Sequence, residues 1–181
     1  MSFTLVLGGA RSGKSRHAEQ LIEAHAAPWT YIATAQAFDD EMRERISLHR
    51  ARRPQGWITV DAPIDLPGAI RAADTGRAIL VDCLTLWLTN VMLSEADVAA
   101  AREDLLAACR AVASPLVLVS SEVGFGIVPD NALARRFRDE LGTLNQALAR
   151  EAAHVVLTVA GLPLKVTCGA CIARRVIPLC A

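Results

Sequence analysis

A glycine-rich stretch near the N-terminus constrains the fold of this chain more than any other feature. Residues 8–15 are Gly-Gly-Ala-Arg-Ser-Gly-Lys-Ser, which fits the phosphate-binding pattern G-x-x-x-x-G-K-[ST]. The run Phe3 to Leu7 before it is apolar and strand-like, and a helical pattern begins at Lys14. The glycines allow a tight turn whose backbone N–H groups, with the helix N-terminus, form an anion site. The stretch therefore predicts a nucleotide phosphate loop, in which Lys14 reaches the β- and γ-phosphates and Ser15 ligates Mg²⁺.

Strand-like runs and helical patterns alternate along the rest of the chain. Helical periodicity, broken at Pro and Gly, predicts helices over residues 14–26, 39–53, 65–73, 84–92, 95–112 and 131–153. Aliphatic, β-branched and aromatic runs predict strands over residues 29–33, 57–60, 78–82, 116–119 and 155–159, and an edge strand over 164–166. Strands that alternate with helices favour a parallel sheet with helices on both faces. The sequence therefore predicts an α/β fold with a mostly parallel sheet.

The composition narrows the class of protein. Of the 181 residues, 52% are hydrophobic and only 4% aromatic, so we expect one domain with a core of aliphatic side chains. The formal net charge is zero, which does not favour the basic surface that nucleic-acid binders use. The longest apolar stretch, Ala78 to Leu93, is interrupted by polar residues, and no secretory signal precedes the first strand. We expect a soluble, cytoplasmic protein with no membrane span and no nucleic-acid partner.

Polar residues at predicted strand ends suit a nucleotide site. Asp82 ends a buried strand, and beside a phosphate loop such an acid is typical of a Mg²⁺ ligand. Residues 34–36 leave the end of another strand, where open parallel sheets bind ligands. Glu122 lies in a glycine-punctuated loop at a third strand end. It is a candidate to orient a substrate hydroxyl or accept its proton, and the alternative is a carboxylate that stabilises the loop.

His49 has two interpretations. It shares one helical stripe with Met42 and Ile46, which is the pattern of a histidine buried in a core. Three arginines lie within residues 50–53, however, and a histidine among arginines could attack a phosphate that they hold, since imidazole can be a nucleophile.

The motifs together resemble one family, the bifunctional adenosylcobinamide kinase / adenosylcobinamide-phosphate guanylyltransferases of cobalamin biosynthesis. The resemblance spans residues 3–166. The stretches that carry it are Gly8 to Glu19, Tyr31 to Gln36, Asp39 to Met42, His49-Arg50 with Arg53-Pro54 and Trp57, and Glu122 to Pro129. One departure is Ser121, which stands where the family pattern has Asn. A phosphate loop and a Glu-Val-Gly loop in one chain are far more specific than a phosphate loop alone.

The resemblance implies two reactions at one enzyme, on a P-loop NTPase fold with a RecA-like sheet. A nucleoside triphosphate, ATP or GTP, phosphorylates adenosylcobinamide. GTP then transfers GMP to adenosylcobinamide phosphate through a GMP-histidine, giving adenosylcobinamide-GDP and pyrophosphate. The histidine of the motif falls on His49. The resemblance also implies a homotrimer.

The resemblance further implies a set of site residues. The catalytic residues would be His49 and Lys14, and the metal ligands Ser15 and Asp82. The residues similar to the nucleotide contacts of the family are Gly8, Gly9, Ala10, Arg11, Ser12, Gly13, Lys14, Ser15, Thr34, Ala35, Gln36, Arg50, Ala51, Arg52, Arg53, Asp61 and Asp82. Glu122 remains the candidate for the substrate.

The last residues resemble no part of the family. We expect a kinase/guanylyltransferase domain over residues 1–166 and a tail of unknown role over residues 167–181. The tail contains Cys168-x-x-Cys171, but one such pair supplies at most half of the ligands of a zinc site, so we expect a plain tail rather than a metal site.

Two other functions compete with the bifunctional enzyme. A small-molecule kinase without nucleotidyl transfer would leave His49 and its arginines structural. A regulatory GTPase would need an Asn-Lys-x-Asp motif, which the chain lacks.

Overall fold

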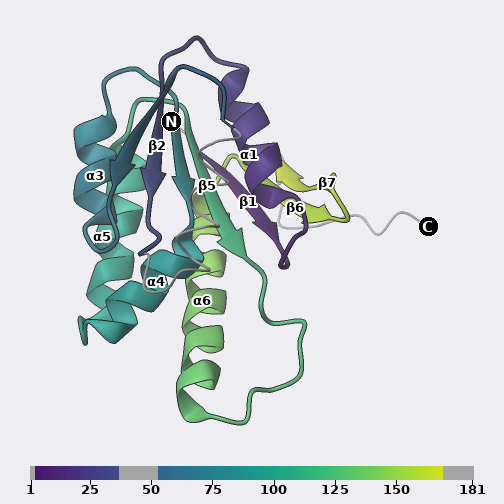
Figure 1. The fold of residues 1–181 in the computed structure, drawn as a ribbon. Helices are drawn as coiled ribbons and strands as arrows, with labels where there is room; N and C mark the ends of the chain where they lie inside the picture. Colours follow the sequence, from purple (N-terminus) through teal and green to yellow (C-terminus); the bar gives the residue numbers. More distant parts are fainter. Residues whose placement is uncertain (1–2, 37–52, 169–181) are drawn as a thin grey trace.

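The protein folds around one seven-stranded sheet (Figure 1). The structure is a computed structural model, and it describes residues 3–36 and 53–168. The sheet order is β3-β2-β4-β5-β1-β6-β7, and all neighbouring pairs are parallel except β6 and β7. The strands are β1 (Thr4–Gly8), β2 (Trp29–Ala33), β3 (Trp57–Asp61), β4 (Ile79–Asp82), β5 (Leu116–Ser121), β6 (His154–Val159) and β7 (Leu162–Cys168). The predicted mostly parallel sheet is confirmed.

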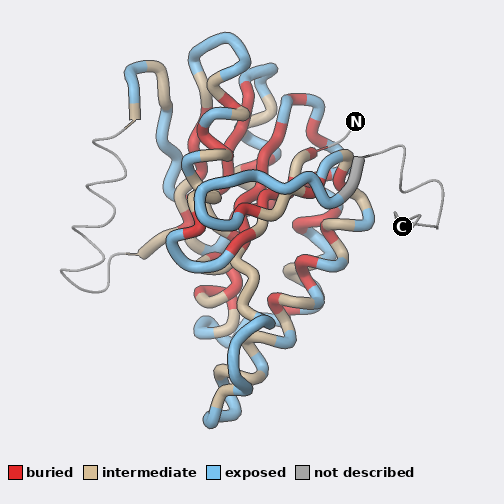
Figure 2. The backbone as a smooth tube through the Cα atoms, turned by 90° about the vertical axis from the view of Figure 1, so that its right-hand side faces the viewer, coloured by how far each residue is buried: buried red, intermediate tan, exposed pale blue. Residues whose placement is uncertain are grey.

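Helices cover both faces of the sheet. They are α1 (Lys14–Glu23), α3 (Leu66–Ala73), α4 (Leu84–Leu93), α5 (Val98–Ala111) and α6 (Ala132–Glu151). Successive strand residues point to opposite faces, so each central strand feeds two apolar clusters. In β4, Ile79 and Val81 pack in a cluster with α3, α4, α5 and α6, whereas Leu80 packs with Ala18 and Ile22 of α1. Figure 2 shows the buried residues gathered along these central strands.

Side-chain caps set several helix starts, because an oxygen there accepts N–H groups that lack a helical partner. Asp65 accepts from the Gly68 N–H at the start of α3, and Asn131 accepts from the Ala134 N–H at the start of α6. Asp97 accepts from two N–H groups at the start of α5. This helix therefore begins at Val98, although we predicted its start at residue 95. The predicted helix over residues 39–53 lies almost wholly outside the described residues.

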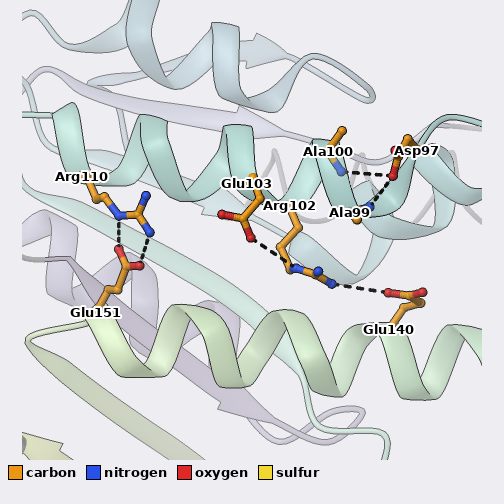
Figure 3. A network of polar contacts seen from close by, with 8 residues as sticks. All are labelled: Asp97, Ala99, Ala100, Arg102, Glu103, Arg110, Glu140 and Glu151. Atoms are coloured by element: carbon orange, nitrogen blue, oxygen red, sulfur yellow. Dashed lines mark hydrogen bonds and ion pairs between the residues drawn. The ribbon is translucent and has the colours of Figure 1, made fainter.

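Ion pairs join helices α5 and α6 on the outside of the larger cluster (Figure 3). Arg110 donates two hydrogen bonds to the Glu151 carboxylate, from Nε at 2.8 Å and from Nη2 at 2.5 Å. Arg102 lies between Glu103 and Glu140, with its Nη1 3.6 Å from Glu140 Oε2. Exposed pairs of this kind contribute about 0–1 kcal/mol each, so apolar packing remains the main support of this face.

The β6–β7 hairpin closes one end of the sheet. We predicted an edge strand over residues 164–166. The observed turn is Ala160-Gly161, and β7 runs from Leu162 to Cys168, two residues past the expected end of the domain. Gly161 supplies the left-handed backbone, with φ of +82°, that lets the strand reverse so tightly. In the described part of the chain, no helix is long and apolar enough to cross a membrane.

Candidate functional site

The phosphate loop joins β1 to α1 at the carboxyl ends of the parallel strands. Two of its glycines are required by geometry. A Cβ on Gly8 would lie 2.3 Å from Ser12 Oγ and 2.4 Å from Thr158 Oγ1, so no larger residue fits. Gly13 has φ of +93°, and a Cβ there would also lie 3.1 Å from the Gly161 Cα atom. The loop is therefore closely packed against its neighbours.

Lys14 starts helix α1, and its side chain folds back over the loop. Its Nζ donates to the Gly9 carbonyl at 3.2 Å. Gly13 is the N-cap of the helix and has no side chain to satisfy the N–H groups of the first turn. An ammonium group and unpaired helix N–H groups thus lie at the same place, which is the arrangement that binds phosphate.

Asp82 ends β4, which is separated from the phosphate-loop strand by β5 alone. The Tyr31 hydroxyl donates to Asp82 Oδ2 at 3.2 Å and so orients the carboxylate. Burial, and then the nearby negative charge of Asp82, raise the pKa of Tyr31 far above its usual value, so this hydroxyl stays a donor. Asp82 and Ser15, which follows the loop, lie at the same edge of the sheet and supply oxygen atoms, the donors that Mg²⁺ prefers.

Thr34 follows β2 but does not present its hydroxyl to a ligand. The residue is fully buried. Its Oγ1 donates to the Cys83 carbonyl at 2.7 Å and accepts from the Cys83 N–H at 2.8 Å. Asn90, buried in α4, donates to the Thr34 carbonyl at 2.9 Å. The side chain of Thr34 therefore fixes the residue after Asp82, and the half-buried Ala35 and Gln36 are the part of this predicted stretch that is open to a ligand.

Of the predicted arginine cluster, Arg53 is described, and residues 50–52 lie outside the described residues, as does His49. The Arg53 guanidinium lies over the Tyr31 ring, 3.4 Å from its centroid. Tyr31 thus contacts Asp82 through its hydroxyl and Arg53 through its ring face. Arg53 and the acid on β4 are brought together by one aromatic residue.

Asp61 lies at the far end of the same sheet edge. It ends β3, the edge strand, and pairs in register with Ala33 of β2. Four strand spacings separate β3 from β1, which corresponds to about 19 Å. Asp61 is therefore placed to reach only the part of a nucleotide most distant from the phosphate loop.

Glu122 lies directly beside the phosphate loop. Its N–H donates to the Gly8 carbonyl at 3.1 Å, and its Oε1 accepts from the Gly124 N–H at 2.8 Å. In Figure 1 the long loop that it opens extends away from the sheet before α6. Phe125 and Ile127 in this loop are 84% and 97% exposed. The carboxylate thus stabilises its own loop, which is one of the two interpretations of Glu122, while its backbone lies beside the phosphate loop.

The sequence did not predict the polar residues that anchor the strands of this site: Asn145, Tyr31 and Thr158. Asn145 of α6 accepts from the Ser120 hydroxyl at 2.7 Å and donates to the Ser121 carbonyl at 3.1 Å, which anchors the end of β5. Tyr31 and Thr158 have similar roles in β2 and β6. The signal available was a polar residue inside an apolar run, but the partner of each lies far away in the sequence.

Comparisons with known proteins point to one family. The family model described as cobinamide kinase / cobinamide phosphate guanyltransferase matches residues 4–166. The bifunctional adenosylcobalamin biosynthesis protein CobP of Pseudomonas aeruginosa is 50% identical over 163 residues, which cover 88% of this chain and 94% of that protein. The protein CobU of Salmonella typhimurium, with the same description, is 45% identical over 178 residues, covering 90% and 98%.

Among solved structures, the chain is similar to one described as a structural study of project PH0250 from Pyrococcus horikoshii. The TM-score is 0.54 with 7% identity, over 92% of this chain and 86% of that one. This likeness supports the α/β fold alone. The sequence comparisons go further, since they cover nearly the whole length of the relatives. The chain therefore belongs to the cobinamide kinase / cobinamide phosphate guanyltransferase family.

Proposed function

We propose that this chain phosphorylates adenosylcobinamide with ATP or GTP and then transfers GMP from GTP to adenosylcobinamide phosphate through a GMP-histidine. The observation that carries the proposal is the family match over residues 4–166 together with the phosphate loop beside Asp82. Family membership favours this function over a kinase without nucleotidyl transfer and over a GTPase switch.

The kinase step depends on placing charge around the transferred phosphoryl group. Lys14 Nζ contacts a neutral carbonyl, that of Gly9, so an incoming phosphate offers it a stronger, charged acceptor. Ser15 and Asp82 would hold Mg²⁺, which neutralises charge on the β- and γ-phosphate oxygens when it is bound. Glu122, beside the Gly8 carbonyl, would orient the substrate hydroxyl or accept its proton.

The guanylyl step needs a neutral histidine. His49 attacks the α-phosphorus of GTP, a nitrogen–phosphorus bond forms, and pyrophosphate leaves with the electron pair of the broken P–O bond. A phosphate oxygen of adenosylcobinamide phosphate then displaces His49 and gives adenosylcobinamide-GDP. Arg50, Arg52 and Arg53 would neutralise the phosphates. The contact of Arg53 with the Tyr31 ring supports this role, because it holds one of these cations next to Asp82.

We also propose a cytoplasmic homotrimer with one domain that includes the whole of β7, to Cys168, followed by a separate tail. Exposed apolar side chains on the hairpin support self-association. Val159 pairs with Leu162 across the hairpin, and Leu164 lies two residues further along the same face of β7. Their exposed fractions are 51%, 68% and 53%, values that suit a surface covered by a second copy.

Covalent labelling tests the proposal. After incubation with α-labelled GTP and Mg²⁺, the wild type should carry label that is stable to base and labile to acid, as a phosphoramidate is. His49→Asn keeps polarity but removes the nucleophile, so this variant should take up no label and still phosphorylate adenosylcobinamide. His17→Asn and His25→Asn are the matched controls and should label normally. Acid-labile label in His49→Asn would show that another residue is the carrier.

A further inference from the structure

The turn of the β6–β7 hairpin lies against the phosphate loop, although more than 140 residues separate them in sequence. The register of β6 on β1 places Thr158 opposite Gly8. Thr158 is 2% exposed and Ser12, in the middle of the loop, is 8% exposed. Polar side chains buried to this degree depend on hydrogen bonds within the protein, because water cannot reach them to take the place of a lost partner.

The two hydroxyls form a chain of hydrogen bonds with a defined direction. Thr158 Oγ1 donates to the Leu7 carbonyl at 3.0 Å, which uses its one hydrogen. The Oγ atoms of Ser12 and Thr158 are 2.9 Å apart, so the Ser12 hydroxyl is the donor and Thr158 the acceptor. Both oxygens occupy the space that a Cβ on Gly8 would need. These hydrogen bonds can form only because Gly8 has no side chain.

A backbone bond holds the same loop residue a second time. The Gly161 N–H, in the hairpin turn, donates to the Ser12 carbonyl at 2.9 Å. Ser12 thus uses its hydroxyl and its carbonyl on the hairpin, and only its N–H side remains directed into the loop. Arg11, just before it, has φ of 54°, a left-handed conformation that is uncommon outside glycine and persists only where the surroundings enforce it.

We propose that Thr158 is a positioning residue for nucleotide binding: it holds Ser12, and thereby the phosphate loop, in its binding shape before the nucleotide arrives. Ordering a backbone residue costs conformational entropy, so a loop already held in place binds phosphate without that loss. The inference deepens the proposed function and rests on it only for the statement that this loop binds the phosphates of GTP.

The test measures the Kd of Mg·GTP by calorimetry and the Tm without nucleotide, for Thr158→Val and Thr158→Ser. Valine keeps the shape but leaves the Ser12 hydroxyl without its acceptor, so we expect the Kd to rise about tenfold. Serine keeps the hydroxyl and should bind within about threefold of the wild type. Thr89→Val is the matched control, because Thr89 also donates to a backbone carbonyl, that of Thr85, but lies in α4 away from the loop.

A double-mutant cycle with Ser12→Ala shows whether Thr158 acts through Ser12. Both single variants remove the bond between Ser12 and Thr158, and Thr158→Val also removes the bond to the Leu7 carbonyl. The double variant Ser12→Ala,Thr158→Val should therefore be no weaker than Thr158→Val, about tenfold below the wild type and not about one-hundredfold. Should Thr158→Val fail to fold, Ser12→Ala alone carries the test and should show the tenfold loss.

Two outcomes would overturn the inference. One is a Thr158→Val variant with a lowered Tm and an unchanged Kd, which would assign the residue to stability alone. The other is full additivity in the cycle. If the wild type itself does not bind Mg·GTP, the proposed function is contradicted as well. That result is distinguishable from the other two, because it is seen in the wild type alone.

Discussion

Replacing Thr34 by valine separates two roles that the sequence could not distinguish. The residue belongs to the predicted nucleotide contacts, but in the structure its hydroxyl is buried and bonded to Cys83 on both sides. If the hydroxyl is structural, its loss should lower stability and leave the response to nucleotide in place. If it contacts the nucleotide, the opposite pattern is expected.

The magnitude follows from the group left unpaired. Valine has nearly the same volume, so it removes one hydroxyl and leaves the Cys83 N–H without a partner, whereas the Cys83 carbonyl still accepts from the Trp87 N–H at 3.1 Å. A buried polar group without a partner costs about 1–3 kcal/mol. The Thr34–Cys83 bonds are only partly buried, so for this one unpaired group we expect a loss in the lower part of the range, about 1–2 kcal/mol. For a domain of this size that corresponds to a decrease in Tm of about 2–8 °C.

The assay is thermal unfolding with and without saturating Mg·GTP. Thr34→Val should unfold at the lower temperature, and added nucleotide should raise its Tm by the same increment as in the wild type. Thr34→Ser keeps the hydroxyl and should stay close to the wild type. A valine variant with wild-type Tm, or one that keeps its Tm but no longer responds to Mg·GTP, would refute the structural role.

Two further predictions concern Lys14 and Asp74. Lys14→Ala removes the ammonium group over the phosphate loop, so kinase turnover should fall by about 10² or more, and near-normal turnover would exclude Lys14 from the site. Asp74 accepts from the Ala113 N–H, the Ser114 hydroxyl and the Ser114 N–H, and these bonds hold its pKa below the usual value. Because the folded-state pKa of this carboxyl is lowered, its ionised form stabilises the fold at pH values above the unfolded pKa of about 4. This stabilisation is lost as the pH falls through the folded pKa. Asp74→Asn should therefore melt below the wild type at pH 7, and the gap in Tm should close under acid; an equal gap at both pH values would contradict this.

Local features of the sequence were enough to predict the phosphate loop and most of the elements around it. Gly13 is demanded by a positive φ of the loop backbone, whereas Gly8 is demanded by the close approach of the Ser12 and Thr158 hydroxyls. Alternation of strands and helices predicts a parallel sheet, because parallel neighbours need a crossover between them. Asp82 could be placed at the same edge as the loop, since the carboxyl ends of parallel strands meet there.

The order of the strands and the partners of the buried polar groups were decided by the tertiary structure alone. Chain order does not say that β5 lies between β1 and β4, or that Thr158 comes to lie against Gly8. In the sequence, Thr34 and Thr158 are both threonines at or near a strand end. In the structure, the Thr34 hydroxyl bonds Cys83, whereas the Thr158 hydroxyl bonds Ser12 of the phosphate loop. The physical reason is that a hydroxyl bonds whichever group packing brings within about 3 Å, and packing across the sheet is set by long-range register rather than by neighbours along the chain.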